Sequence, residues 1–156
     1  IELYTDSSGN LELGCGDYCQ GHWSYWSWPL GWESSIFKEM SFLELVPILL
    51  AMYLWGKKYF ANKKIIMYID NNALVSIVNR QTSKSKRVMV LLRKLVLLLL
   101  RNDIMFKAQH ILGKKNNIAD SLSRKQFHHF RQLAQWADLN PETIPDEFLA
   151  MMSEMK

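Results

Sequence analysis

The sequence predicts an α/β domain built on a five-stranded mixed sheet with helices on both faces. Three observations predict this class: strand-like segments that open the chain, two later apolar runs typical of strands, and helical patterns between and after those runs. A length of 156 residues suits one domain. The composition, with 49% hydrophobic and 22% charged residues, is close to the globular average and excludes disordered and fibrous proteins.

The first part of the chain is expected to form an antiparallel meander. Residues 1–6 alternate apolar and polar side chains, which is typical of a strand with one buried face. Residues 7–10, Ser-Ser-Gly-Asn, have the composition of a turn, and residues 11–17 and 21–28 predict two further strands. A loop is expected over residues 29–38.

A helix is predicted next, over residues 41–55. Glu44 is its sole charged residue, so we expect the helix to be buried on most sides. Ser41 is in position to cap it, because Glu44 follows at the spacing of a capping box. Residues 65–69 form a continuous apolar run, which is typical of a strand covered on both faces. A short helix is expected over residues 73–79.

The remaining elements follow from periodicity and composition. Residues 88–99 carry leucine and valine at helical spacing and predict an amphipathic helix with its cations outside. Residues 104–111 predict the fifth strand, and residues 117–137 predict one final helix.

The domain is predicted to span residues 1–137, followed by a tail over residues 138–156. That tail is either a linker toward a downstream domain or a strap that packs Phe148, Met151 and Met152 on the body. Because the chain starts at Ile1 rather than Met, we interpret it as a piece of a longer protein.

Charge is distributed very unevenly along the chain. Residues 1–56 carry a net charge of −6, residues 57–137 carry +14, and residues 138–156 carry −4. So basic a middle segment favours a polyanionic partner such as nucleic acid, although lysines that only solvate helix faces would give the same count.

No membrane association is expected from the richest apolar stretch, residues 88–100. It is too short for a bilayer and contains Arg93 and Lys94. Cys15 and Cys19 are expected to be free thiols, which favours a reducing compartment, the cytoplasm or the nucleus.

Four acidic residues stand where an unpaired carboxylate is costly. Asp6 closes the first strand, Glu44 lies on the apolar helix, Asp70 closes the buried strand, and Asp120 begins the last helix. Strand ends and helix starts in a mixed sheet can meet at one edge, and converging carboxylates repel each other unless hard cations such as Mg²⁺ or Mn²⁺ bind. A carboxylate cluster beside a basic surface suits metal-assisted phosphodiester hydrolysis.

Each acid also has an ordinary explanation. Asp6 can begin the turn that follows it, and Glu44 can complete a capping box with Ser41. Asp70 can cap the next short helix, and Asp120 can complement the dipole of its own helix. Composition and spacing leave these alternatives open.

Family motifs carry more information. The string Thr5-Asp6-Ser7-Ser8-Gly9, followed by Gly14-Cys15-Gly16, resembles the opening of ribonuclease H domains. Leu43-Glu44-Leu45 is similar to the segment of their catalytic Glu, and Tyr68-Ile69-Asp70-Asn71 to that of their second Asp. Residues 110–124 resemble the terminal block of retroelement ribonuclease H domains, through the pattern Asn-x-x-Ala-Asp-x-Leu-Ser-Arg. The resemblance spans residues 1–125 and implies a ribonuclease H-like fold.

Four shorter strings narrow the resemblance to retrotransposons of the DIRS-like, tyrosine-recombinase type, related to the LTR type, in which ribonuclease H follows a reverse transcriptase. They are Gly21-His22-Trp23, Leu45-Val46-Pro47-Ile48, Asp70-Asn71-Asn72-Ala73-Leu74-Val75 and Phe130-Arg131-Gln132-Leu133-Ala134. The implied partner is the reverse transcriptase polymerase domain of the same polyprotein. The isolated domain is expected to be monomeric.

The resemblance implies catalysis with two Mg²⁺ ions, for which Mn²⁺ can substitute. Asp6 would bridge the ions, Glu44 and Asp70 would hold the ion on the leaving-group side, and Asp120 the ion that carries the attacking water. The implied substrate is the RNA strand of an RNA·DNA hybrid, cut to leave a 3′-hydroxyl and a 5′-phosphate.

Contacts to the hybrid are expected from short polar and basic side chains. Ser8, Asn10 and Asn72 are candidates for contacts to 2′-hydroxyls or base edges, since RNA is recognised in a shallow minor groove. Candidates for phosphate contacts are Lys84, Lys86, Arg87, Lys114 and Lys115.

Lys114 departs from the family. Many cellular ribonucleases H have a histidine directly after the glycine that matches Gly113, where this chain has Lys114. This difference favours a slow enzyme. The alternative functions are a catalytically weak or inactive nucleic-acid-binding or scaffold domain of the same fold, and a related DNA nuclease or integrase, against which the terminal block argues.

Overall fold

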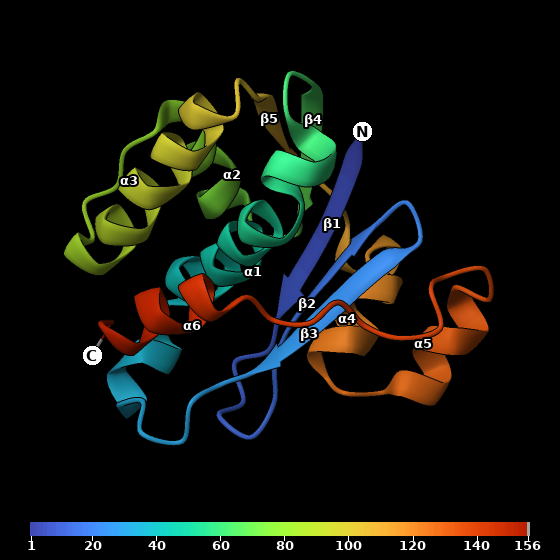
Figure 1. Cartoon of the computed structure of the whole chain (residues 1–156). Helices are drawn as coiled ribbons and strands as arrows, with labels where there is room; N and C mark the ends of the chain where they lie inside the picture. The colour runs from blue at the N-terminus through green and yellow to red at the C-terminus, as the bar shows by residue number, and fades with distance from the viewer. Residues whose placement is uncertain (156) are drawn as a thin grey trace.

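The computed structural model describes residues 1–155, which form three layers: a central sheet between two groups of helices (Figure 1). The sheet has five strands in the order β3-β2-β1-β4-β5. Strand β2 is antiparallel to both β1 and β3, whereas β4 runs parallel to both β1 and β5. The strands are β1 (Glu2–Ser7), β2 (Gly14–Cys19), β3 (His22–Ser27), β4 (Lys64–Ile69) and β5 (Met105–His110). The predicted fold class is confirmed.

The helices divide between the two faces of the sheet. One face is covered by α1 (Met40–Trp55), α2 (Asn72–Arg80), α3 (Lys86–Arg101) and α6 (Asp146–Ser153), which share one core with the strands. The other face is covered by α4 (Asn117–Ser123) and α5 (Phe127–Leu133). Shorter helical turns occupy Ser34–Lys38, Gly56–Phe60 and Gly113–Lys115.

Helix α1 is the centre of the larger core. Its side chains from Phe42 to Met52 are all buried, as the apolar composition predicts. Burying each large aliphatic side chain contributes roughly 1.5–3 kcal/mol. The helical stretch Met40–Phe60 is long and apolar enough to cross a bilayer, but 72% of its most apolar window is buried inside the fold. That burial explains its hydropathy as core packing.

The start of α1 differs from the prediction. The helix begins at Met40, one residue before Ser41, so Ser41 lies inside its first turn. The carbonyl of Glu39 accepts hydrogen bonds from the amides of Phe42 and Leu43, which closes the first turn without a capping box. The Glu39 carboxylate is held by Arg87 and by the Ser85 hydroxyl at the start of α3. Glu44 therefore does not take part in capping α1.

Two strands also differ from expectation. β2 begins at Gly14 rather than at residue 11, because a turn in which the Leu13 amide donates to the Asn10 carbonyl extends the first hairpin. β4 is covered on one face only: alternate residues are buried, while Ile66 and Tyr68 are half-buried. The Tyr68 ring stacks on Tyr4 with centroids 4.9 Å apart on that second face.

The single final helix predicted over residues 117–137 is wrong. The chain forms α4 and α5 instead, separated at Lys125, which has the left-handed φ of 58°. The break lets Phe130 of α5 turn back onto the sheet, where it packs against Tyr18 and Trp23. Burial of these rings outweighs the local preference for a continuous helix.

Residues 138–155 cross the edge of the sheet and end in α6 beside α1 (Figure 1). Phe148, Met151 and Met152 are buried in the main core, which is the strap arrangement rather than a free linker. The division of the chain at residue 137 stays a prediction.

Candidate active site

Four acidic side chains reach one edge of the sheet from four elements. Asp6 is near the end of β1, and Asp70 directly follows β4. Because β1 and β4 are parallel neighbours, their carboxyl ends lie at the same edge. Glu44 approaches this edge from α1 on one face, and Asp120 from the first turn of α4 on the other.

The carboxylates of three of these residues form a compact cluster. One oxygen from each of Asp6, Glu44 and Asp70 lies within 4.8 Å of the other two. Asp120 borders the same cleft, which has a volume of about 440 Å³. The cleft is lined by Asp6, Ser7, Ser8, Gly9, Met40, Glu44, Asp70, Asn71, Asp120 and Arg124.

Burial makes this cluster electrostatically strained. Asp6 is only 4% exposed and Glu44 3%. Burial, repulsion from Asp70 and contact with Asp120 raise the pKa of Asp6 to about 8, although a hydrogen bond from Ser123 opposes the shift. Burial, followed by the charges of Asp6 and Asp70, raises the pKa of Glu44 well above its usual value. Without a counter-charge, the cluster therefore holds protons that free carboxylates would lose.

The close approach of α4 to the sheet depends on a glycine. A Cβ at Gly16 would lie 2.4 Å from Cβ of Leu122, so a larger residue on β2 would push α4 away. With α4 in place, the Ser123 hydroxyl donates a hydrogen bond to Oδ2 of Asp6 over 3.1 Å. The same approach brings Asp120 to the cleft.

Asp120 has a basic neighbour on its own helix. Nε of Arg124 donates to Oδ1 of Asp120 over 3.0 Å. The two side chains are 54% and 40% exposed, so the pair lies at the mouth of the cleft rather than in its interior. Among the described residues, Arg124 is the basic residue that lines the cleft.

The ordinary explanations for three of the acids have different outcomes in the structure. Asn71, not Asp70, caps α2: its side chain accepts a hydrogen bond from the amide of Leu74 over 3.2 Å. Asp6 lies inside β1, before the turn. Asp120 does occupy the first turn of α4, where it complements the helix dipole as well as bordering the cleft.

The predicted 2′-hydroxyl contacts divide into two groups. Ser8 borders the cleft, and its hydroxyl accepts a hydrogen bond from the amide of Asn10. The Asn10 side chain in turn accepts from the amide of Glu12, so both residues also stabilise the hairpin turn. Asn72 is exposed at the start of α2, but the cleft is lined by its neighbour Asn71.

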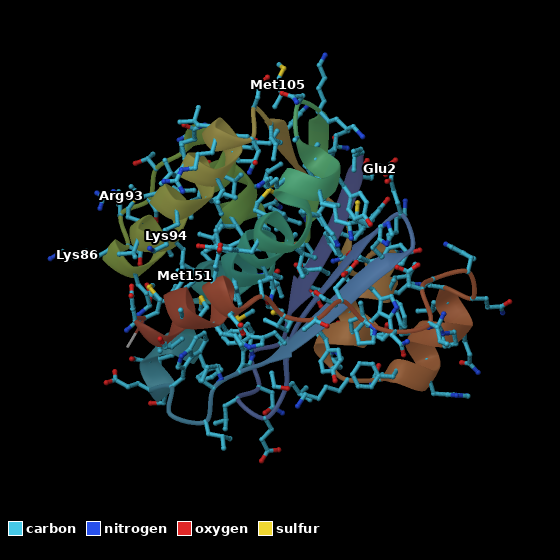
Figure 2. The ribbon with its side chains drawn as sticks, in the orientation of Figure 1. Glu2, Lys86, Arg93, Lys94, Met105 and Met151 are labelled. Atoms are coloured by element: carbon cyan, nitrogen blue, oxygen red, sulfur yellow. The ribbon has the colours of Figure 1, made fainter. Side chains whose placement is uncertain are left out.

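The predicted phosphate contacts lie outside the cleft lining. Lys84, Lys86, Lys114 and Lys115 are exposed, whereas Arg87 is partly buried in its ion pair with Glu39. Lys86 and Arg93 project from the outer side of α3 (Figure 2).

The short helical turn Gly113–Lys115 lies close to Asp70, since a Cβ at Gly113 would lie 3.9 Å from Oδ2 of Asp70. Lys114 is the next residue in the sequence after Gly113, which lies beside the acidic cluster.

Several residues of the site were not among the predicted ones: the cleft residues Ser7, Gly9, Met40, Asn71 and Arg124, and Ser123, which donates a hydrogen bond to Asp6. Ser123 and Arg124 belong to the Asn-x-x-Ala-Asp-x-Leu-Ser-Arg block, and Asn71 follows Asp70 directly. The signal was therefore present in the motifs, but a serine that orients an aspartate is visible only once α4 is packed on the sheet.

The same architecture occurs in a known ribonuclease. The ribonuclease H1 of the halophilic archaeon Halobacterium salinarum superposes with a TM-score of 0.59, over 82% of this chain and 97% of that protein, at 12% sequence identity. This chain has a ribonuclease H-like fold. The N-terminal ribonuclease H domain of a Mycobacterium tuberculosis protein superposes with a TM-score of 0.51, over 85% of this chain and 96% of that chain, at 14% identity. No protein-family model and no curated protein matches the sequence.

Proposed function

We propose that this ribonuclease H-like domain is a metal-dependent endonuclease that hydrolyses the RNA strand of RNA·DNA hybrids. The observation that supports it most is the cluster of Asp6, Glu44 and Asp70 at the carboxyl edge of the sheet. A fold tolerates converging buried carboxylates at a cost in free energy, and such a cost is typical of functional sites.

The donor set suits hard divalent cations. All four acids offer oxygen atoms, which Mg²⁺ and Mn²⁺ prefer. Oε2 of Glu44 is buried and has no hydrogen-bond partner among residues 1–155, as expected of an oxygen reserved for a ligand. In this proposal Asp6, Glu44, Asp70 and Asp120 hold two Mg²⁺ ions. Bound ions of this kind supply an activated water and stabilise the charge on the leaving oxygen.

The protein residues would orient the substrate and the ligands. Ser123 orients the Asp6 carboxylate through its hydrogen bond to Oδ2. Arg124 presents a positive charge at the mouth of the cleft, where a phosphate of the hybrid would lie. Ser8, within the hairpin turn between β1 and β2, offers a further hydroxyl to the cleft.

The context of the domain is proposed from its motifs. The block at residues 116–124 and the shorter strings favour a retrotransposon polyprotein, with a reverse transcriptase polymerase domain as partner. Because Lys84, Lys86, Lys114 and Lys115 lie outside the cleft lining, the isolated domain would bind a hybrid weakly. We propose it as a monomer.

A second candidate function is a nucleic-acid-binding or scaffold domain with little or no activity. The ion pair between Asp120 and Arg124 supports it, because a guanidinium already occupies one oxygen of that carboxylate. Lys114, next to Gly113, adds a further positive charge near the cluster.

The two functions are separated by one cleavage assay. Three labelled substrates are incubated separately with the protein and Mg²⁺ or Mn²⁺. They are an RNA·DNA hybrid, duplex RNA and duplex DNA of the equivalent sequence. The proposed function requires cleavage of the hybrid alone, and at least a hundredfold loss in Asp6→Asn and Asp70→Asn while circular dichroism stays unchanged. Asp103→Asn is the matched control, since Asp103 is exposed at the turn after α3. Intact hybrid at high protein concentration with Mn²⁺ would favour the scaffold.

A further inference from the structure

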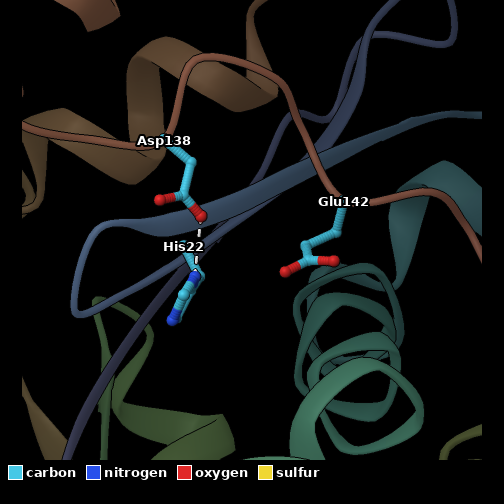
Figure 3. Close-up of side chains that lie close together, drawn as sticks. All are labelled: His22, Asp138 and Glu142. Carbon is cyan, nitrogen blue, oxygen red and sulfur yellow. Dashed lines mark hydrogen bonds and ion pairs between the residues drawn. The ribbon is translucent and has the colours of Figure 1, made fainter.

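A second group of metal-binding side chains lies away from the acidic cleft, where the C-terminal strap crosses the sheet. His22 begins β3, and Asp138 and Glu142 belong to the extended segment between α5 and α6 (Figure 3). One ligand atom from each of the three lies within 4.8 Å of the other two.

The backbone holds the strap in position beside β3. The amide of Asp138 donates to the carbonyl of Gly21 over 2.8 Å, and the amide of Glu142 donates to the carbonyl of Trp23 over 2.8 Å. The indole of Trp23 also donates to the Asp138 carbonyl over 2.7 Å. These bonds bring both carboxylates close to the His22 side chain, with that of Asp138 joined to its ring by a hydrogen bond (Figure 3).

The three side chains are oriented by their neighbours as well. Nδ1 of His22 lies 2.7 Å from Oδ2 of Asp138. The His22 ring stacks on Tyr59, with centroids 4.7 Å apart and planes 8° apart, which fixes the direction of Nδ1. The indole of Trp55 donates to Oε1 of Glu142 over 3.4 Å. Outer contacts of this kind orient the ligands of metal sites.

We propose that His22, Asp138 and Glu142 bind a divalent transition-metal ion, Zn²⁺ in the first instance, that fastens the strap to β3. One imidazole nitrogen and two carboxylate oxygens form a mixed donor set that suits Zn²⁺ and that Mg²⁺ disfavours. Bonds of about 2.0–2.2 Å in a tetrahedral site would place the ligand atoms roughly 3.3–3.6 Å apart. Since the three ligand atoms already lie within 4.8 Å of one another, small side-chain rotations would bring them to these separations.

The surroundings leave access for the metal and for a water as fourth ligand. The His22 and Asp138 side chains are 29% and 49% exposed. The bound ion would connect β3, which carries His22, to the segment that leads into α6 and its buried Phe148. It is a structural role, independent of hydrolysis in the acidic cleft.

The test removes the competing cleft first. Protein carrying Asp6→Asn and Asp70→Asn is stripped with chelator and titrated with Zn²⁺, by calorimetry and by thermal unfolding. The site predicts one equivalent bound and a rise in Tm of several degrees, which the same concentration of Mg²⁺ does not produce. His22→Gln and Glu142→Gln in the same background should weaken Zn²⁺ binding at least tenfold. His129→Gln, at an exposed position of α5, should leave it unchanged.

Co²⁺ provides a readout that stability does not affect. Co²⁺ bound at this site should show the strong visible absorption bands that are typical of tetrahedral Co²⁺. These bands should disappear in His22→Gln. The proposal is overturned if Zn²⁺ leaves Tm unchanged, or if the Zn²⁺ shift survives in Glu142→Gln. The proposal is also overturned if His22→Gln lowers Tm while Zn²⁺ changes the Tm of neither protein. That result would show that His22 and Asp138 form an ion pair without a metal.

Discussion

Nε of Arg124 donates a hydrogen bond to Oδ1 of Asp120 over 3.0 Å, one helical turn away on α4. The contact joins a carboxylate of the cleft to the basic residue at its mouth. A cation that binds Asp120 must compete with this guanidinium. If Asp120 binds a metal ion, as proposed, the ion pair opposes that binding, and displacement of Arg124 from Asp120 would free its guanidinium to contact a phosphate.

Arg124→Ala should increase the affinity for Mn²⁺ or Mg²⁺ several-fold, because it removes a competing positive charge from Asp120. The same variant should bind hybrid more weakly, because a phosphate contact is lost. Metal affinity is measured by calorimetry, and hybrid affinity by fluorescence anisotropy. Arg93→Ala, on the outer side of α3 (Figure 2), controls for the loss of one charge. Unchanged metal affinity in Arg124→Ala would contradict the competition.

Metal binding should release protons near neutral pH. Burial and the neighbouring carboxylates raise the pKa of Asp6 to about 8 from 3.8, so Asp6 holds a proton at pH 7 that a binding cation displaces into the buffer. Metal affinity should rise with pH up to about 8 and then level. Calorimetry at pH 7 in buffers of different ionisation enthalpy measures the protons released. Asp6→Asn should release fewer, and equal release in both proteins would contradict this origin.

The same raised pKa affects metal-free stability with a defined sign. The folded state holds a proton on Asp6 that the unfolded chain has lost, so this group makes the fold less stable as pH rises from about 4 to about 8. Saturating Mn²⁺ should abolish that part of the decline in Tm. A decline of equal slope with and without Mn²⁺ would count against the cluster as the metal site.

Asp17 should destabilise the fold in a pH-dependent way. It is fully buried on β2 beneath α1, and burial raises its pKa well above the usual value even though Ser24 donates to it. Its Oδ1 has no hydrogen-bond partner in the described part of the chain. Folding above pH 4 therefore requires proton uptake, which costs about 1.4 kcal/mol per pH unit.

Asp17→Asn removes that cost, so its stability relative to the native protein should increase from pH 5 to pH 8, as measured by urea unfolding. Asp103→Asn, at an exposed position, should show a pH-independent difference close to zero. A constant difference for Asp17→Asn would mean that Asp17 is not protonated in the fold.

Phe148→Ala should destabilise the protein by about 3–5 kcal/mol, because it leaves a cavity where a fully buried ring packs against Trp26 and Tyr53. Leu149→Ala, one residue later and 42% exposed, should cost about 0.5 kcal/mol. Both are measured by urea unfolding. Equal, small effects would show that residues 138–155 contribute little to the core.

Several elements could be predicted because their signals are local. The apolar run at residues 65–69 and the leucine spacing at residues 88–99 each define an element without reference to the rest of the chain, and the structure confirms both as β4 and α3. The coverage of β4 could not be predicted in the same way. It depends on how far α4 extends across the sheet, and Tyr68 lies beyond it.

Boundaries failed where a distant contact outweighed a local preference. Ser41 has the sequence of a cap, but Glu39 is fixed by Arg87 and Ser85 from α3 and the helix starts earlier. The final helix was predicted as continuous, yet Phe130 gains more by turning back onto β2 and β3.

The sequence by itself determined the order of the five strands and of the helices as far as α4, the four candidate acids, and the motif that contains two of the cleft residues, since each is a property of neighbouring residues. Only the tertiary structure decided which side chains from distant segments share space: Ser123 with Asp6, and His22 with Asp138 and Glu142. Separations of 116 residues or more, as for His22 and Asp138, leave no periodic trace, because packing rather than chain proximity brings such groups together.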